Sequence, residues 1–294
     1  MSPTWDAGKK PPPTKVTLWR LLLAVFRVII LSAVVFGGLA ILLLLRFAEG
    51  PLFGRYRPLT PFLTQGVCRT AFLILGIGFR SRGQAMSHPG AVVANHSSWL
   101  DIFALNAGAR IYFVSKSEVA GWPGIGWLAR ATGTVFIRRD PKEAKQQKAT
   151  FQTRLLAGHR LLFFPEGTST DGLQVLPFKS TLFAAFFDEK LRCDMYIQPV
   201  TVLYHAPPDQ AAEFYGWWGD MSFQSHLVKT LLTPRQGTVD VVYHQPVQVA
   251  SYRDRKALAA DVEARVRAGH WGPVKTPRGD KTHKHSGGAD RPCA

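Results

Sequence analysis

A histidine and a carboxylate five residues apart are the most distinctive chemical feature of the sequence. His96 and Asp101 lie in the segment NHSSWLD, residues 95–101, which directly follows the short apolar run 91–94. In α/β proteins, reactive groups lie at such strand ends. Histidine accepts a proton near neutral pH, and a carboxylate bonded to its second ring nitrogen fixes the tautomer and stabilises the imidazolium. We therefore predict that His96 is a general base and Asp101 its orienting partner. The alternative is structural: Asn95 or Ser97 caps a helix, Asp101 is a solvated helix residue and His96 fills space.

Two further clusters also follow apolar runs. One run ends at Arg138 and Arg139, whose guanidinium groups suit a phosphate or a carboxylate. The run LLFF at 161–164 leads into the turn sequence PEGTST. In that turn, Glu166 could accept a hydrogen bond from a substrate hydroxyl or bind an arginine, and Gly167 permits close backbone approach. Each cluster taken alone is also typical of an ordinary charged surface or turn.

The elements that must position these residues alternate along the chain. Short apolar runs and helical patterns follow one another after residue 88, which predicts an α/β fold with a mixed sheet flanked by helices. We expect strands at 91–94, 111–114, 134–137, 160–164, 196–203 and 239–243, and helices at 141–158, 182–187 and 254–268.

The N-terminal part of the chain is suited to a membrane. Val28–Leu45 is an uncharged run of 18 residues, and a helix of this length spans about 27 Å, close to the thickness of the hydrocarbon core. We predict a transmembrane helix, or a re-entrant one that turns at Gly37 and Gly38. The next apolar stretch, 62–79, is interrupted by Gln65 and Arg69, so we predict an interfacial or returning helix there.

The formal net charge of +16 predicts affinity for polyanions, which include nucleic acids and anionic membranes. The basic residues concentrate beside the apolar segments and in the tail, and no nucleic-acid-binding signature is present. We therefore expect the basic termini to bind an anionic membrane surface, and we expect no nucleic-acid partner. No His or Cys cluster has the spacing of a metal site, so we expect no metal.

Taken together with a fourth, apolar block at 197–202, the three clusters resemble the lysophospholipid acyltransferase family, which includes the 1-acylglycerol-3-phosphate acyltransferases. The other blocks fall on 96–101, 133–139 and 164–168. The resemblance implies no cofactor, and acyl-ACP or acyl-CoA as a co-substrate, with acyl carrier protein as a partner. It also implies catalysis by His96 and Asp101 and acceptor binding by Arg138, Arg139, Glu166, Gly167 and Thr168.

One departure from the family pattern bears on the acceptor. Members that act on lysophosphatidate usually have Arg after Glu-Gly-Thr, where this sequence has Ser169. The run from Ser169 through Asp171 to Lys179 looks more like the branch that acylates lyso-ornithine lipid, a zwitterion without phosphate. Asp171 would then face the amine of the head group, and Arg138 or Lys179 its carboxylate. Ser169 and Lys179 are therefore added to the predicted acceptor site.

The predicted organisation has five parts. These are a basic Pro-rich N-terminus at 1–17, a transmembrane or re-entrant helix at 18–46, a second membrane-associated helical segment at 47–87, an acyltransferase domain at 88–270 and a disordered basic tail at 271–294.

We therefore expect an O-acyltransferase that transfers a fatty acyl group to the free hydroxyl of a lysolipid. The preferred acceptor is lyso-ornithine lipid, in ornithine lipid biosynthesis, and the alternative is lysophosphatidate, which would give phosphatidic acid; one enzyme could use both. The resemblance places the chain in a bacterial inner membrane with its catalytic domain facing the cytoplasm. A serine hydrolase is disfavoured because the sequence has no G-x-S-x-G motif. A non-enzymatic basic membrane or nucleic-acid-binding protein is the third interpretation.

Overall fold

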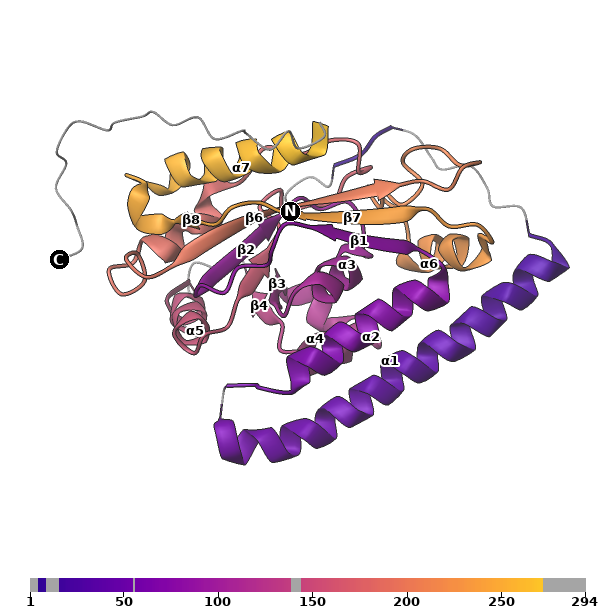
Figure 1. Ribbon diagram of the computed structural model, residues 1–294, viewed down its shortest axis with the longest axis horizontal. Coiled ribbons are helices and arrows are strands. Elements are labelled where there is room, and N and C mark those ends of the chain that lie inside the picture. The colour runs from indigo at the N-terminus through magenta and orange to yellow at the C-terminus, as the bar shows by residue number, and fades with distance from the viewer. Residues whose placement is uncertain (1–4, 9–15, 55, 139–143, 272–294) are drawn as a thin grey trace.

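The computed structural model of the chain describes residues 5–8, 16–54, 56–138 and 144–271. The predicted tail lies outside this part except for its first residue, and so do Arg139 and most of the predicted Pro-rich N-terminus. Figure 1 shows the described residues as a central sheet with helices on both sides of it.

The sheet has eight strands in the order β1-β7-β6-β2-β5-β3-β4, with β8 paired to β6. Strands β2 to β6 run parallel to one another, whereas β7 is antiparallel to β6. The carboxyl ends of β2, β5, β3 and β4 therefore meet at one edge of the sheet. The mixed α/β sheet that the sequence predicts is confirmed. The strands are β1 (Gly78–Arg82), β2 (Gly90–Ala94), β3 (Tyr112–Lys116), β4 (Val135–Ile137), β5 (Leu161–Phe163), β6 (Tyr196–His205), β7 (Thr238–Tyr243) and β8 (Val247–Gln248).

Each face of the sheet has its own apolar core because successive strand residues point to opposite faces. In β2, Val92 and Ala94 belong to one core and Ala91 and Val93 to the other. In Figure 1, α7 lies above the sheet and α2 below it. The first core is covered by α2 (Thr60–Leu75), α3 (Asp101–Gly108) and α6 (Phe223–Leu232), and the second by α5 (Ala144–Leu156), the 3-10 helix η3 (Ser180–Phe187) and α7 (Arg255–Trp271).

All six predicted strands are present, with ends that shift by two residues at most. The predicted helix at 182–187 is a 3-10 helix, and α3, α6 and the short α4 (Ile125–Ala131) were not predicted. The strand β1 corrects a predicted boundary, because it lies inside the segment 47–87 and the sheet therefore begins at Gly78. Its sequence, GFRSR, lacks apolar alternation because β1 is an edge strand.

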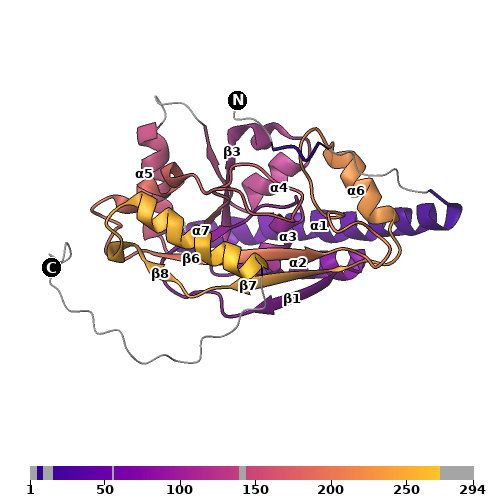
Figure 2. The same ribbon diagram turned by 90° about the horizontal axis from the view of Figure 1, so that it is seen from above.

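Helix α1 (Leu18–Phe53) is joined to the rest of the molecule at two points, through Arg27 and through Glu49. It has 36 residues and is therefore about 54 Å long. Near its start, Arg27 donates hydrogen bonds to the carbonyl oxygens of Leu231 and Thr233 beside α6, at 2.9 and 2.7 Å. Near its end, Glu49 accepts from the backbone N–H of Thr60, at 3.1 Å. Figure 2 shows α1 passing beside α6, so α1 follows the surface of the domain.

The predicted turn within α1 is wrong, because the helix continues through Gly37 and Gly38. A Cβ atom at Gly38 would lie 2.5 Å from Cγ2 of Val67 in α2. The glycine therefore serves close packing of the two helices, which accounts for its presence without a turn.

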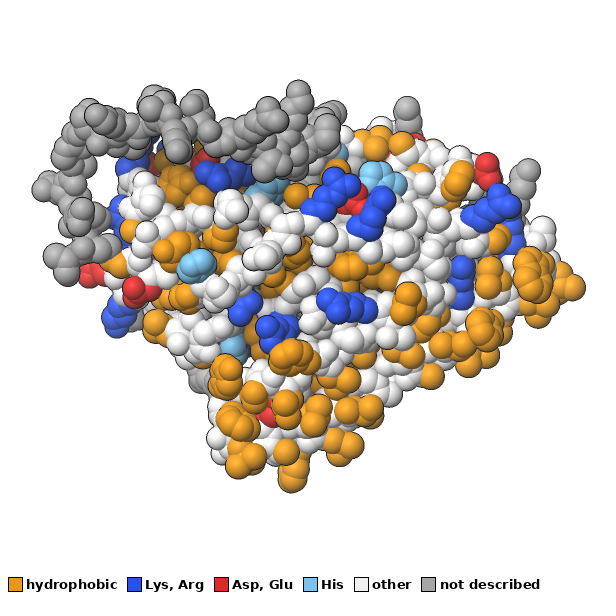
Figure 3. All heavy atoms as spheres, viewed as in Figure 1, with side chains coloured by type: hydrophobic (Ala, Val, Ile, Leu, Met, Phe, Trp, Pro, Cys, Tyr) orange, Lys and Arg blue, Asp and Glu red, His pale blue; other side chains and the backbone are white. Residues whose placement is uncertain are grey.

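The outer side of α1 is apolar and exposed. Among the residues that the structure describes, α1 is the one helix long and apolar enough to cross a membrane. Figure 3 shows hydrophobic side chains gathered along the lower edge of the molecule, where α1 lies. The exposed side chains of α1 include Trp19, Phe26, Ile29, Leu44 and Phe47, each at least 60% exposed.

Candidate active site

The predicted catalytic pair is formed in the structure. Nδ1 of His96 lies 2.7 Å from Oδ2 of Asp101, whose side chain is fully buried. The same oxygen accepts the backbone N–H groups of Ser97 and Ser98 at 2.8 and 3.0 Å. These two N–H donors hold the carboxylate at the first turn of α3. The pairing orients the ring so that Nε2 is the nitrogen free to accept a proton.

The ring of His96 is also held by packing. It stacks on Phe164, the residue after β5, with ring centroids 4.0 Å apart and planes 12° apart. Within the described part of the chain, neither Ser97 nor Ser98 donates a hydroxyl hydrogen bond to His96, and both serines are buried. Neither of the two serines that follow His96 in the sequence is therefore placed as the nucleophile of a serine hydrolase.

Glu166 makes contacts that the sequence did not predict. Its carboxylate oxygens accept the backbone N–H groups of His96 and Leu176, at 2.6 and 2.7 Å, and the residue is 2% exposed. Burial raises the pKa of Glu166 to about 8, and the two backbone N–H groups act in the opposite direction. Each oxygen accepts one backbone N–H, so Glu166 holds the backbone of His96. Acceptor binding by Glu166 stays a prediction.

The turn after Glu166 lies next to a lysine. Gly167 has a φ of +74°, and a Cβ atom there would lie 2.6 Å from Nζ of Lys179. Glycine is favoured at this position by its left-handed conformation, and the flexible, exposed side chain of Lys179 is its nearest neighbour. Lys179 is exposed, and Thr168 and Ser169 are half-buried in the same turn. Predicted site residues from two separate segments thus meet beside His96.

Arg138 is not placed next to the catalytic pair. It is exposed and follows β4, which is three strands away from β2 in the sheet. At the usual strand spacing this separation is about 14 Å. Arg138 does lie at the same edge of the sheet as His96, because β2 and β4 run in the same direction.

Residues that the sequence did not single out complete the walls of the site. The N–H of Thr170 donates to the carbonyl oxygen of His96 at 3.0 Å, and the N–H of Trp217 donates to that of Ser97 at 2.9 Å. A Cβ atom at Gly172 would lie 3.3 Å from Cβ of Ser97, so the loop that carries Asp171 also lies against the catalytic segment. These contacts join segments far apart in sequence, and local spacing gives no signal for them.

Asn95 fixes the strand end that carries His96. It is fully buried, its Oδ1 accepts the backbone N–H of Val202 at 2.8 Å, and its Nδ2 donates to the carbonyl oxygen of Val202 at 2.9 Å. The side chain therefore bridges the end of β2 to the neighbouring strand β6. Its place directly between an apolar strand and a histidine is the sequence signal that could have identified it.

A tyrosine lies behind the catalytic carboxylate. Oη of Tyr204 and Oδ1 of Asp101 are both buried, and neither has a hydrogen-bond partner among the described residues. Burial, the negative charge of Asp101 and an interaction between its carboxylate and the Tyr204 hydroxyl raise the pKa of Tyr204 well above its usual value. Tyr204 is therefore a neutral phenol that neighbours Asp101.

No group of three or more His, Cys, Asp or Glu side chains converges within the described ranges in the way that a metal site would require. Catalysis independent of metal stays a prediction.

The chain was compared with known proteins. The Acyltransferase family model matches residues 79–203. The lyso-ornithine lipid O-acyltransferase of Rhodobacter capsulatus is 55% identical over 91% of this chain and 97% of its own length. The corresponding protein of Brucella abortus is 39% identical, over 65% of this chain and 76% of its own length. The 1-acyl-sn-glycerol-3-phosphate acyltransferase of Neisseria gonorrhoeae is 31% identical, over 67% and 76%.

A solved structure supports the fold. The 1-acyl-sn-glycerophosphate acyltransferase PlsC of Thermotoga maritima matches with a TM-score of 0.63 over 86% of this chain and 95% of its own, at 23% identity. The blocks that suggested the resemblance fall within the matched residues 79–203. The family expectation is thereby confirmed, and the chain belongs to the acyltransferase family, together with the lyso-ornithine lipid O-acyltransferases and the 1-acyl-sn-glycerol-3-phosphate acyltransferases.

Proposed function

We propose that this enzyme transfers a fatty acyl group from a thioester to the free hydroxyl of lyso-ornithine lipid. The observation that carries the proposal is the His96–Asp101 pair, 2.7 Å apart at the carboxyl end of β2, in a chain 55% identical to a lyso-ornithine lipid O-acyltransferase. His96 takes the proton of the hydroxyl through Nε2 as the oxygen attacks the thioester carbonyl, and the thiol leaves. Asp101 stabilises the imidazolium that forms.

The donor is acyl-ACP or acyl-CoA, and the acyl carrier protein is a proposed partner. A thioester needs no cofactor for this step, because its thiol leaves readily and the base comes from the protein. A metal ion has no part in this proposal.

The head-group assignment depends on the charges around the site. Ser169 supplies no cation after the Glu-Gly-Thr turn, whereas Lys179 lies beside Gly167 and Asp171 lies on the loop that contacts Ser97. A carboxylate at Lys179 and an amine at Asp171 would suit ornithine. Lysophosphatidate is the second candidate, because Arg138 lies at the same sheet edge and a relative with that activity in its name is 31% identical.

The enzyme associates with membranes through its N-terminal helices. Arg27 and Glu49 fasten α1 to the domain at two points, so we propose that α1 lies along one leaflet with its exposed apolar side in the acyl chains. A bacterial inner membrane with the active site on the cytoplasmic side follows from the thioester donor. The basic termini would strengthen binding to anionic lipid, and no nucleic-acid partner is proposed.

The acceptor is tested with the full chain in membranes that are supplied with labelled acyl-ACP. We expect labelled ornithine lipid from lyso-ornithine lipid at a rate about tenfold above the rate of phosphatidic acid formation from lysophosphatidate, the difference that one charged contact produces. Membranes without the protein serve as the blank. A faster reaction with lysophosphatidate would contradict the head-group assignment and leave the chemistry intact, and no transfer to either acceptor would contradict both.

The position of Tyr204 behind Asp101 gives a second prediction. We expect Tyr204→Phe to lower kcat about tenfold at neutral pH, because the buried carboxylate loses a neighbouring hydroxyl donor.

The control for this prediction is Tyr56→Phe, because Tyr56 is 59% exposed and lies far along the chain from the catalytic segment. The thermal unfolding midpoint is measured beside kcat and KM for both substrates. A Tyr204→Phe enzyme with an unchanged kcat would show that the tyrosine only fills space.

A further inference from the structure

A polar cavity lies between the end of α1 and α5. Its volume is about 450 Å³. Three arginines and a histidine line it, and none of its described lining residues is acidic. Hydroxyl and amide groups supply the remaining polar surface. The lining residues are Arg46, Arg57, Gln146, Ala149, Thr150, Thr153, Arg154 and His159.

Two of the arginines share one aromatic ring. The guanidinium carbons of Arg57 and Arg154 lie 5.7 and 4.7 Å from the ring centroid of Tyr112. Arg154 is fixed further by donating to the carbonyl oxygen of Gly133 at 2.8 Å and to Nδ1 of His159 at 2.6 Å. The two cationic side chains are therefore held in place before any ligand binds, which lowers the entropic cost of binding.

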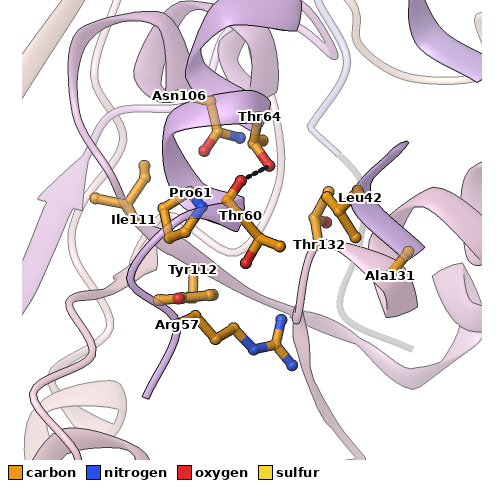
Figure 4. Close-up of a pocket in the computed structure, with 10 residues that line it drawn as sticks. All are labelled: Leu42, Arg57, Thr60, Pro61, Thr64, Asn106, Ile111, Tyr112, Ala131 and Thr132. Carbon is orange, nitrogen blue, oxygen red and sulfur yellow. Dashed lines mark hydrogen bonds between the residues drawn. The ribbon is translucent and has the colours of Figure 1, made fainter. Parts of the chain in front are cut away.

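Among the described lining residues, Arg57 is the one with a buried, unsatisfied hydrogen-bond donor. Its Nε is buried and has no hydrogen-bond partner within the part of the chain that the structure describes. Burial and the neighbouring charge of Arg46 both lower the pKa of Arg57. Figure 4 shows Arg57 beside Tyr112 in a smaller adjoining pocket, which Thr60 and Thr132 also line. Arg46 already pairs with Glu49 at 3.5 Å, and an anion near Arg46 and Arg57 would further relieve the repulsion between the two arginines.

The cavity is separate from the catalytic site. Tyr112 is the first residue of β3 and pairs with Leu161, which in turn pairs with Ala91 near the start of β2. His96 follows the other end of β2, five residues later, which is about 16 Å along the strand direction. The part of the cavity that Arg57 and Arg154 line, beside Tyr112, therefore lies toward the opposite edge of the sheet from the catalytic pair.

Exposed aromatic side chains lie next to the cavity in the chain. Phe47 follows Arg46 directly and is 85% exposed, and Tyr56 precedes Arg57 and is 59% exposed. The guanidinium of Arg110 lies 4.2 Å from the ring centroid of Phe62, which is also exposed. Aromatic rings beside basic residues are typical of the membrane interface, and the apolar side of α1 continues from this end.

We propose that this cavity binds the phosphate group of an anionic membrane phospholipid, whose acyl chains lie along the exposed side of α1. Arginine guanidinium groups bind phosphate oxygens through paired N–H donors. Bound lipid would fix the end of α1 against α5 and set the height of the domain on the membrane. The site is independent of the acyl acceptor and of its identity.

The test measures retained lipid by native mass spectrometry of the full chain in nonionic detergent. The probes are phosphatidylglycerol, phosphatidylcholine and, separately, soluble glycerol phosphate. We expect preferential retention of phosphatidylglycerol, and at least tenfold weaker retention in the double variant Arg57→Gln, Arg154→Gln. The matched control is Arg235→Gln, Arg253→Gln, which removes the same charge at exposed positions.

Two further measurements distinguish a loss of lipid binding from a loss of folding. Acyl transfer with detergent-dispersed substrate should stay within about twofold of the intact enzyme in the double variant, because the cavity is remote from His96. Arg57→Lys, which keeps the charge, should retain more lipid than Arg57→Gln if the variants differ in binding and not in folding. Equal loss in the control pair, or binding of glycerol phosphate as tight as that of phosphatidylglycerol, would overturn the proposal.

Discussion

Replacing Asp101 by asparagine is expected to lower kcat about a thousandfold, within the range that general-base catalysis contributes. The backbone N–H groups of Ser97 and Ser98 both donate to Oδ2 of Asp101. They would select the amide oxygen at that position, so His96 would keep a hydrogen-bond acceptor for Nδ1 and its tautomer. What is lost is the negative charge that stabilises the imidazolium when the acceptor hydroxyl gives up its proton.

The measurement is kcat and KM for both substrates, together with the thermal unfolding midpoint. KM should change little, because Asp101 is buried and makes no contact with solvent. Asp209→Asn is the matched control, since it makes the same chemical change at an exposed loop position. A loss in kcat of less than about tenfold would mean that His96 acts without its carboxylate, and a loss confined to KM would place Asp101 in substrate binding.

The sequence predicted the contact between His96 and Asp101 because the contact is local. The segment 95–101 needs only one turn between a strand and a helix to bring Asp101 to His96. The role of Glu166 was missed for the opposite reason. Its bond to the N–H of His96 depends on β2 and β5 being neighbours in the sheet. A motif gives the residue type at a strand end, and strand order decides what that residue contacts.

The same distinction applies to the fold. Strands with an apolar core on each face, such as β2, are continuous apolar runs and were predicted well. The edge strand β1 was missed because its stability comes from residues of β7. Nε of Arg80 in β1 lies 2.6 Å from Oδ1 of Asp240 in β7. The composition of α1 predicts affinity for a membrane. It does not predict the contact of Arg27 with α6, because the carbonyl groups that Arg27 binds belong to Leu231 and Thr233, which come 204 and 206 positions later in the chain.

Asn95→Ala is expected to lower the free energy of unfolding by about 3 kcal/mol, because it leaves the N–H and C=O of Val202 buried without their side-chain partners. It should also lower kcat about tenfold, since β2 would no longer be fixed to β6 where His96 begins. Asn106→Ala is the matched control. Among the residues that the structure describes, Asn106 donates to the carbonyl oxygen of Ile102 in its own helix and to no other group, so a cost of about 1 kcal/mol is expected.

The isosteric variant Asn95→Asp tests whether the amide is needed as both donor and acceptor. One oxygen of the new carboxylate would accept the N–H of Val202, while the other would face the carbonyl oxygen of Val202. Burial and this repulsion disfavour the ionised form, so its pKa in the folded state is expected to rise above the unfolded value of about 3.9. Stability from the protonated group is then fully present below the unfolded pKa and is lost as pH rises through the folded pKa.

Chemical denaturation of this variant and of the intact enzyme from acid to neutral pH measures the effect. Equal stability of the two proteins at neutral pH would show that shape alone, and not the two opposed hydrogen bonds, is what position 95 requires.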